Sequence, residues 1–266
     1  MRAADINKKV LMFGAALLAV AGTASAQVIA TDTFSYPDGP LVPNGGWANH
    51  SGTVGDLLVS GGQVVVQHGT PSEDANLAFT GVAGNVYYGI DFSVDDLGAP
   101  YAAGGDYEYF AHFREGFNFS GRLDIVAPTG AGDFTVGISS DGSTADVLWP
   151  TDLTYATTYR AIVRYDQDLN IAQLWIDAAV DTDASVTGAD QADPGDAVVS
   201  FGLRQSDSTE NETVRVDNLA VGQTFDDVLA IGGGPVGVPA MPTSLLFALA
   251  GLVGIAGITL ARRRRN

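Results

Sequence analysis

Apolar side chains alternate with polar ones along most of the chain between residues 27 and 228. In the clearest case, Val86, Tyr88, Ile90 and Phe92 fall on one side of an extended segment and the residues between them on the other. A period of two residues is the signature of a β-strand with one buried face. No sustained helical period of 3.6 residues occurs before residue 238. We therefore expect an all-β domain.

Clusters of Gly, Asp, Asn and Pro separate the alternating runs, and these residues favour turns. The predicted strands cover residues 28–34, 57–59, 64–66, 86–94, 107–113, 123–125, 134–138, 147–148, 159–165, 171–176, 198–203 and 213–221. So many strands exceed what one open sheet holds comfortably, so two packed sheets are expected. The architecture that fits best is a two-sheet jelly-roll sandwich.

The first 26 residues have a different pattern. Three basic residues precede an apolar run from Val10 to Ala21, and Thr-Ala-Ser-Ala follows up to Ala26. These are the three regions of a secretory signal peptide. Residues 1–26 are therefore predicted to be cleaved after Ala26, which leaves Gln27 first and implies export. The alternative is an uncleaved anchor, for which this apolar run is short.

A second apolar segment lies at the other end of the sequence. Residues 244–261 carry no charge, and as a helix they would extend about 27 Å, close to the hydrocarbon thickness of a bilayer. Arg262, Arg263, Arg264 and Arg265 follow, on the flank that the positive-inside rule assigns to the cytoplasm. We predict a transmembrane helix over 244–261, with a Gly-rich spacer (231–237) between it and the β-domain (27–230).

Val238, Pro239 and Pro242 precede this helix, so residues 238–266 combine a short proline motif, an apolar helix and a terminal arginine cluster. This layout resembles the PEP-CTERM type of sorting signal, with Pro-Ala-Met-Pro in place of the usual Pro-Glu-Pro. The resemblance implies an exosortase-type processing peptidase as a partner. It also implies insertion in the inner membrane before processing, and then a place on the cell surface or outside the cell.

The composition narrows the classes of partner. The chain has no cysteine, so an exported domain of this sequence must be stabilised by its core rather than by disulfides. Residues 27–237 contain six arginines, no lysine and 30 acidic side chains, a formal net charge of −24. A surface this acidic repels the phosphates of nucleic acids and anionic lipids. It is typical of a protein in saline surroundings, or of one that holds divalent cations.

Several phrases in the β-domain carry a second resemblance. They include T-F-S-Y-P-D-G-P-L, N-G-G-W-A-N-H-S-G-T, F-N-F-S-G-R, T-T-Y-R-A-I-V-R-Y-D and V-R-V-D-N-L-A-V-G. These phrases look like landmarks of exported bacterial surface proteins with the concanavalin A-like (laminin-G-like) fold, over roughly residues 31–228. The resemblance implies a jelly roll and points to no particular activity.

We find no convincing catalytic motif. The five glutamates do not form the E-x-D-x-x-E pattern of sandwich-fold glucanases, and the chain lacks G-x-S-x-G and H-E-x-x-H. One alternating segment places Glu108, His112 and Arg114 on one side and Tyr109 on the other. A glycan-active enzyme, a glycosidase or lyase with Glu108 and Asp124 as its carboxylates, is therefore the alternative to a non-catalytic protein.

Aspartates gather where they could supply the hard oxygen ligands that Ca²⁺ prefers. Asp32 in the first strand and Asp217 in the last would meet if the terminal strands pair, as they do in jelly rolls. One loop contains five aspartates: Asp181, Asp183, Asp190, Asp193 and Asp196. A third acidic segment, residues 166–170, is better explained as a hairpin turn. A structural Ca²⁺ ion is the one cofactor that the sequence suggests, and plain solubilisation by acidic residues is the alternative.

Carbohydrate binding needs aromatic rings that stack on sugars, with polar groups beside them. Trp47, Trp149 and Tyr155 fall in predicted loops and are the candidate ligand-binding residues, unless they close the ends of the core. We predict a non-catalytic protein of the cell surface or extracellular matrix that acts in adhesion or polysaccharide binding. The remaining alternative is a purely structural surface protein.

Overall fold

The computed structural model describes residues 27–69, 71–102, 108–189, 195, 197–206 and 209–229. The predicted signal peptide, the spacer and the sorting signal with its transmembrane helix lie outside the described residues. Within the described ranges, no helix is long and apolar enough to cross a membrane.

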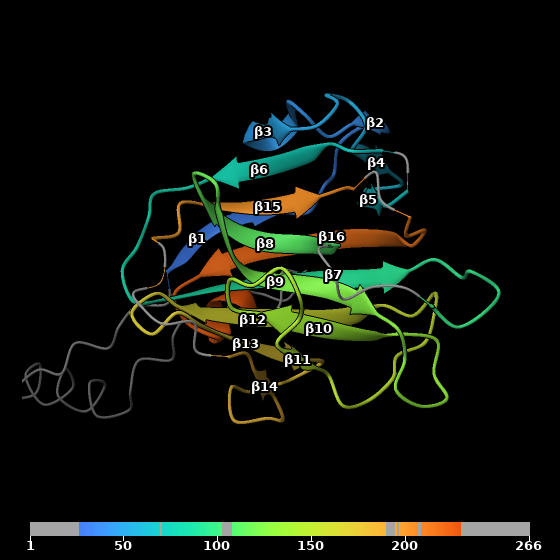
Figure 1. The fold of residues 1–266 in the computed structure, drawn as a ribbon. Coiled ribbons are helices and arrows are strands. Elements are labelled where there is room, and N and C mark those ends of the chain that lie inside the picture. Colours follow the sequence, from blue (N-terminus) through green and yellow to red (C-terminus); the bar gives the residue numbers. More distant parts are fainter. Residues whose placement is uncertain are drawn as a thin grey trace, which may run out of the picture.

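The described chain forms two antiparallel sheets, which lie in two layers (Figure 1). In this part of the chain, sheet A has nine strands, with the order β14-β13-β12-β7-β16-β5-β4-β2 and β1 paired with β16. Its strands are β1 (Val28–Asp32), β2 (Gly39–Pro40), β4 (Leu58–Ser60), β5 (Gln63–Gln67), β7 (Asn85–Val94), β12 (Tyr159–Asp166), β13 (Ile171–Ile176), β14 (Val186–Thr187) and β16 (Thr213–Gly222).

Sheet B has seven described strands in the order β11-β10-β9-β8-β15-β6-β3. They are β3 (Trp47–Ser51), β6 (Asp74–Ala78), β8 (Tyr109–Glu115), β9 (Asn118–Val126), β10 (Thr135–Ser139), β11 (Val147–Leu148) and β15 (Ser200–Arg204). Two short 3-10 helices accompany the strands, η1 (Asn44–Gly46) and η2 (Asp226–Val228). The prediction of an all-β two-sheet jelly-roll sandwich is confirmed.

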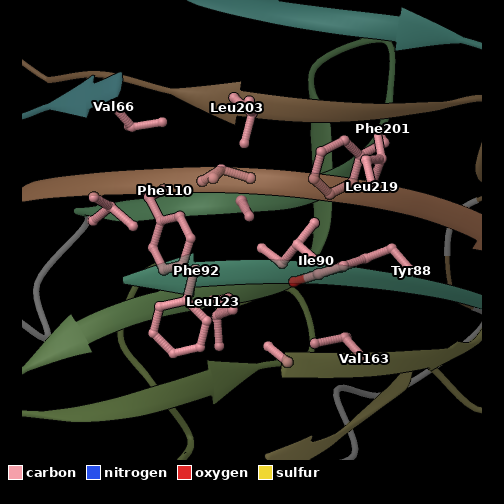
Figure 2. Packing of buried hydrophobic residues seen from close by; sticks show 14 of the residues in the cluster. Val66, Tyr88, Ile90, Phe92, Phe110, Leu123, Val163, Phe201, Leu203 and Leu219 are labelled. Atoms are coloured by element: carbon pink, nitrogen blue, oxygen red, sulfur yellow. The ribbon is translucent and has the colours of Figure 1, made fainter. Parts of the chain in front are cut away.

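The core lies between the two sheets, and aromatic rings fill its centre (Figure 2). Tyr88 of β7 packs edge-on against Phe113 of β8 and Phe201 of β15, with 5.0 Å between ring centroids in each pair. On the same strand, Phe92 packs against Phe110 at 5.9 Å. All five rings are fully buried. The alternation that predicted β7 therefore places one side of that strand in the core, as expected.

The segment after the last strand covers the outer face of sheet A. Phe225 packs edge-on against Trp175 of β13 at 5.4 Å, and η2 follows directly. Arg160 of β12 fastens this segment, because its guanidinium donates a 2.7 Å hydrogen bond to the carbonyl of Val228. Leu229, where the continuous description ends, packs in the same cluster. The last described residues thus lie over the outer face of sheet A.

Two segments differ from the sequence-based expectation. Residues 47–51 form strand β3 rather than a loop, because Trp47 is held in the core by a 2.7 Å hydrogen bond from its indole nitrogen to Asp32. In β8, Tyr109 and His112 lie on the same face, with ring centroids 5.2 Å apart, although they were expected on opposite faces. The register between β8 and β9 shifts twice within this stretch, and each irregularity changes which face the following side chains occupy.

Candidate functional site

The outer face of sheet B carries a cluster of polar and aromatic side chains that the core does not use. The neighbouring side chains of β8 and β9 on the inner face, such as Phe110 and Leu123, belong to the core. We call the group on the other face the outer-face cluster. It consists of His50 on β3, Tyr109, His112 and Arg114 on β8, Phe119, Arg122 and Asp124 on β9, and Arg204 on β15.

Tyr109 is the centre of this cluster. The guanidinium carbons of Arg122 and Arg204 each lie 4.8 Å from the centroid of its ring. Phe119 lies beside it, 6.2 Å from the tyrosine ring and 5.7 Å from the Arg122 guanidinium. Contacts of this kind between a cation and a ring are worth about 0.5–2 kcal/mol each and fix the orientation of the guanidinium plane. The result is a packed group of rings and cations in which Tyr109 is buried and Phe119, Arg122 and Arg204 are partly exposed.

His112 is buried within the cluster without a hydrogen-bond partner among the described residues. Its exposed fraction is 0%, and neither ring nitrogen is hydrogen bonded. The ring has room because Gly202 lies opposite on β15, where an added Cβ would come within 2.6 Å of Cε1 and Nε2. Burial, assisted by the charges of His50 and nearby arginines, holds the pKa of His112 well below its usual range. The ring is therefore neutral at pH 7, with one donor and one acceptor to offer.

Asp124 is the second buried polar group of the cluster without a described partner. Its exposed fraction is 1%, and neither carboxylate oxygen accepts a hydrogen bond. Burial raises the pKa of Asp124 well above its usual range, although the charge of Arg122 opposes the change. A buried polar group without a partner costs about 1–3 kcal/mol and calls for an explanation. Two such groups in one cluster make it the candidate functional site of the described structure.

Glu108 lies at the edge of the cluster, where it forms a 3.3 Å ion pair with Arg204. Its charge contributes to the raised pKa of Asp124, so the two carboxyl groups lie within electrostatic reach of each other. The structure thus brings together the residues that the sequence offered for an enzyme. Tyr109, on the same face, was expected on the opposite one.

No family model matches the chain, and no curated protein matches it in sequence. Solved structures with a similar fold do exist. The Lotus tetragonolobus seed lectin is 12% identical, with 73% of this chain and 97% of the lectin covered and a TM-score of 0.47. The carbohydrate recognition domain of Emp47p is also 12% identical, with 74% and 95% covered and a TM-score of 0.45. A sialidase is 14% identical, with 76% of this chain and 19% of the sialidase chain covered and a TM-score of 0.48.

The likeness to these structures is confined to the arrangement of the strands. At such low identities and TM-scores, what the neighbours bind or cleave carries no argument for this chain. Ligand and activity are therefore inferred below from the residues of this protein.

The three aromatic residues proposed from the sequence lie in the core rather than on a surface. Trp47, Trp149 and Tyr155 have exposed fractions of 2%, 9% and 7%. Tyr155 stacks on Phe134 at 5.6 Å, and its hydroxyl donates to the carbonyl of Ala99. All three belong to the hydrophobic core cluster, so none offers an open face to a sugar.

The predicted meeting of the terminal strands is confirmed, since β1 pairs with β16 and Asp32 lies opposite Leu219. However, the Asp32 carboxylate already accepts hydrogen bonds from the amide of Phe34, the hydroxyl of Tyr36 and the indole of Trp47. These donors compete with a cation for the same oxygens. Asp32 therefore acts as a structural acceptor at the start of the domain.

The other aspartates proposed as calcium ligands do not converge in the described structure. Asp217 accepts a 2.7 Å hydrogen bond from the amide of Asn218, and burial raises its pKa, as do the charges of Asp91 and Asp32. Asp181 and Asp183 are exposed, and Asp183 accepts hydrogen bonds from two backbone amides of its own loop. Asp190, Asp193 and Asp196 lie outside the described residues.

One group of three potential metal ligands occurs among the described residues: His68, Glu210 and Glu212, with ligand atoms within 4.8 Å of one another. These side chains already satisfy one another. His68 Nδ1 lies 2.6 Å from Glu212, and the Tyr101 hydroxyl donates to both carboxylates. Ca²⁺ takes six to eight oxygens, and a set with one imidazole and two engaged carboxylates does not fit it. We derive no metal chemistry from this group.

The sequence singled out four members or neighbours of the site, Glu108, His112, Arg114 and Asp124. It did not identify His50, Tyr109, Phe119, Arg122 or Arg204 as site residues. One signal was available: the arginines on β8, β9 and β15 are half of the six in the acidic β-domain. What the sequence lacked was the register of β8 against β9 and β15, which decides that these side chains share a face.

Proposed function

We propose that this protein is an exported, non-catalytic polysaccharide-binding protein and that the outer-face cluster holds the sugar. The observation that carries the proposal is that Phe119 and Arg122, both partly exposed, lie beside His112 and Asp124, two buried polar groups without a described partner. Sugars present hydroxyls in pairs, which planar polar groups bind well, and their C–H faces pack on aromatic rings. In this cluster Phe119 offers a ring, and Arg114 and Arg122 offer planar polar groups, all three partly exposed.

The predicted signal peptide and sorting signal support export. The position of the last described residue also suits a protein displayed at the cell surface. The described chain ends at Leu229 over the outer face of sheet A, whereas the cluster lies on the outer face of sheet B. We propose that residues 238–266 act as a PEP-CTERM-type signal read by an exosortase-type peptidase. Before processing, the tail would then leave the sandwich over the face opposite the cluster.

The first test is affinity electrophoresis of the full-length protein through gels that contain neutral or acidic polysaccharides. We expect at least one polysaccharide to retard the wild type, and His112→Ala to lose that retardation. Arg164→Gln, on the outer strand face of sheet A, is the control and should behave as wild type. Wild-type mobility that no polysaccharide changes would contradict the proposal.

A glycan-active enzyme is the second candidate, because the cluster contains an acid and a base in suitable states. Burial favours a protonated Asp124 and a neutral His112, the forms that donate and accept a proton. Product release from the retained polysaccharide by wild type, but not by Asp124→Asn or Glu108→Gln, would establish catalysis. Retention without any product over long incubation would exclude it for that polysaccharide.

A further inference from the structure

The six arginines of the β-domain differ in whether they form an ion pair with a described carboxylate. Acidic side chains outnumber them 30 to six in residues 27–237, so carboxylate partners are plentiful. Three arginines form ion pairs: Arg160 with Asp91 at 3.1 Å, Arg204 with Glu108 at 3.3 Å, and Arg215 with Asp95 at 2.7 Å. Arg114, Arg122 and Arg164 have no carboxylate within 4.0 Å in the described part of the chain.

Two of these three arginines belong to the outer-face cluster. Arg114 has a buried Nε that makes no hydrogen bond with the described residues. Arg122 donates from its Nε to the carbonyl of Phe119 at 3.0 Å, and its guanidinium rests on the Tyr109 ring. That contact holds the planar group in place, so little entropy is lost when its other nitrogens bind a ligand.

The groups around these arginines do not neutralise them. Asp124 and Asp141 both act on Arg122 electrostatically, but neither lies within ion-pair distance; burial favours the uncharged acid at Asp124, and Glu108 is engaged by Arg204. His50 and His112 are uncharged at pH 7, because burial lowers the pKa of both. The cluster is thus a locally cationic surface on a domain whose formal net charge is −24.

We infer that the outer-face cluster takes a polysaccharide that bears carboxylate groups, a uronate, and that Arg114 and Arg122 bind its carboxylates. This inference rests on the proposed function, and it names the ligand class of the same site. A guanidinium matches a planar carboxylate with two parallel hydrogen bonds, which makes arginine suited to this recognition. Phe119, which is partly exposed, then offers a ring contact to the sugar to which the carboxylate is attached.

The acidic remainder of the domain does not prevent such binding in saline surroundings. At an ionic strength of about 0.15 M, charges separated by more than about 8 Å are largely screened, whereas arginines in direct contact with the ligand are not. Binding should therefore depend on direct contacts between the polyanion and the arginines of the cluster, rather than on long-range attraction. Raising the salt concentration should weaken binding little, unlike the steep loss seen when many phosphates are contacted.

The experiment compares each uronate polymer with its own neutral counterpart. Full-length protein, in a detergent without sugar groups, is titrated with polygalacturonate and alginate and with the carboxyl-reduced form of each. EDTA is present throughout, so that no divalent cation bridges carboxylates of the protein and the polymer. The variants are Arg114→Gln, Arg122→Gln and Arg164→Gln, the last of which removes the same charge from an arginine of sheet A that likewise lacks a described ion pair.

We expect tighter binding of at least one uronate polymer than of its reduced form. Arg114→Gln and Arg122→Gln should each weaken uronate binding by roughly 10-fold or more, because each removes a charge-assisted contact. Both should leave the melting temperature close to that of wild type, and Arg164→Gln should bind as wild type does.

The outcomes separate this inference from the proposed function. Equal binding of a uronate polymer and its reduced form, unchanged by Arg114→Gln and Arg122→Gln, would overturn the ligand class and leave the proposed function standing. Equal losses in all three arginine variants would also overturn it, since binding would then follow total charge. If the protein binds no polysaccharide of either kind, the proposed function fails with it.

Discussion

Asp124 on the outer face of sheet B lowers the stability of the folded protein. A carboxyl group on β9 is buried without a hydrogen bond to any described residue, and burial raises its pKa well above the usual range. For an acid with a raised pKa, folded and unfolded states are both protonated below about pH 3.9, and ionisation then makes no difference to stability. Above that pH the unfolded state ionises first, so stability falls with rising pH until the folded group ionises as well.

Asp124→Asn should therefore stabilise the protein at pH 7, by more than about 1 kcal/mol of unfolding free energy, because it removes this ionisation. The gain should shrink as the pH falls toward 4, where the wild-type carboxyl is protonated in both states. Denaturant unfolding at several pH values measures it. An Asp124→Asn protein that is less stable than wild type at pH 7 would contradict the account of a buried, unsatisfied acid.

Unlike Asp124, the buried side chains of His68 and Glu212 have each other as hydrogen-bond partners. Burial alone would lower the pKa of His68, but the hydrogen bond and charge of Glu212 outweigh it and raise the pKa. The pair's contribution is complete below the unfolded histidine pKa of about 6.5, and it is lost as the pH rises through the folded value.

Glu212→Gln should cost about 3 kcal/mol of stability at pH 6, because breaking one side of a buried pair leaves the other charge uncompensated. The cost should decline toward higher pH as His68 loses its proton. Chemical unfolding at pH 6 and pH 9 tests both statements, with the exposed Glu115→Gln as the charge-matched control. A cost that does not depend on pH would show that His68 is not ionised in the folded protein.

At the level of the elements, the sequence predicted regular strands well and irregular ones poorly. β7, β12 and β13 alternate cleanly, and their ranges were predicted within one residue. β8 and β9 contain register irregularities, which alternation alone cannot reveal, and these decide that Tyr109 joins His112. The site was thus only partly predictable: its residue types were visible, but the face that each one occupies depends on pairing between strands distant in sequence.

Gly202 on β15 has no side chain, and this leaves room for the His112 ring in the cluster. Gly202→Ala would place a methyl group 2.6 Å from the imidazole, so the ring would have to move. We expect a loss of about 1–3 kcal/mol from overpacking, together with lost polysaccharide binding. Gly142→Ala, whose Cβ would make only ordinary contacts, is the control. Normal binding by a folded Gly202→Ala protein would show that the position of His112 does not matter.

At the level of the whole molecule, the two outer faces of the sandwich differ. Part of the face of sheet A is covered by the protein's own segment, with Phe225 against Trp175. The face of sheet B carries the outer-face cluster, with polar groups that the described chain leaves unsatisfied. A domain with a net charge of −24 also concentrates half of its arginines on that one face.

The described aspartates should not give calcium a specific stabilising effect on the folded domain. The described aspartates proposed as its ligands either accept protein hydrogen bonds or lie apart on exposed loops. A specific ion present at a hundred times its Kd would add about 2.7 kcal/mol, which raises the melting temperature by several degrees in a domain of this size. Melting in EDTA, in Ca²⁺ and in Mg²⁺ at equal ionic strength should give matching values, and a calcium-specific rise would contradict this expectation.

The central claim is that the outer face of sheet B holds a sugar, and the histidine resonances test it most directly. The chain has three histidines, of which His50 and His112 lie in the cluster, while His68 is hydrogen bonded to Glu212. We would record the imidazole NMR signals of the full-length protein, assigned with His112→Asn, as a retained polysaccharide is shortened to oligosaccharides and added. The account predicts that the His112 and His50 signals shift on binding and that the His68 signal keeps its position. Binding that leaves the His112 signal unchanged would place the sugar elsewhere and contradict the account.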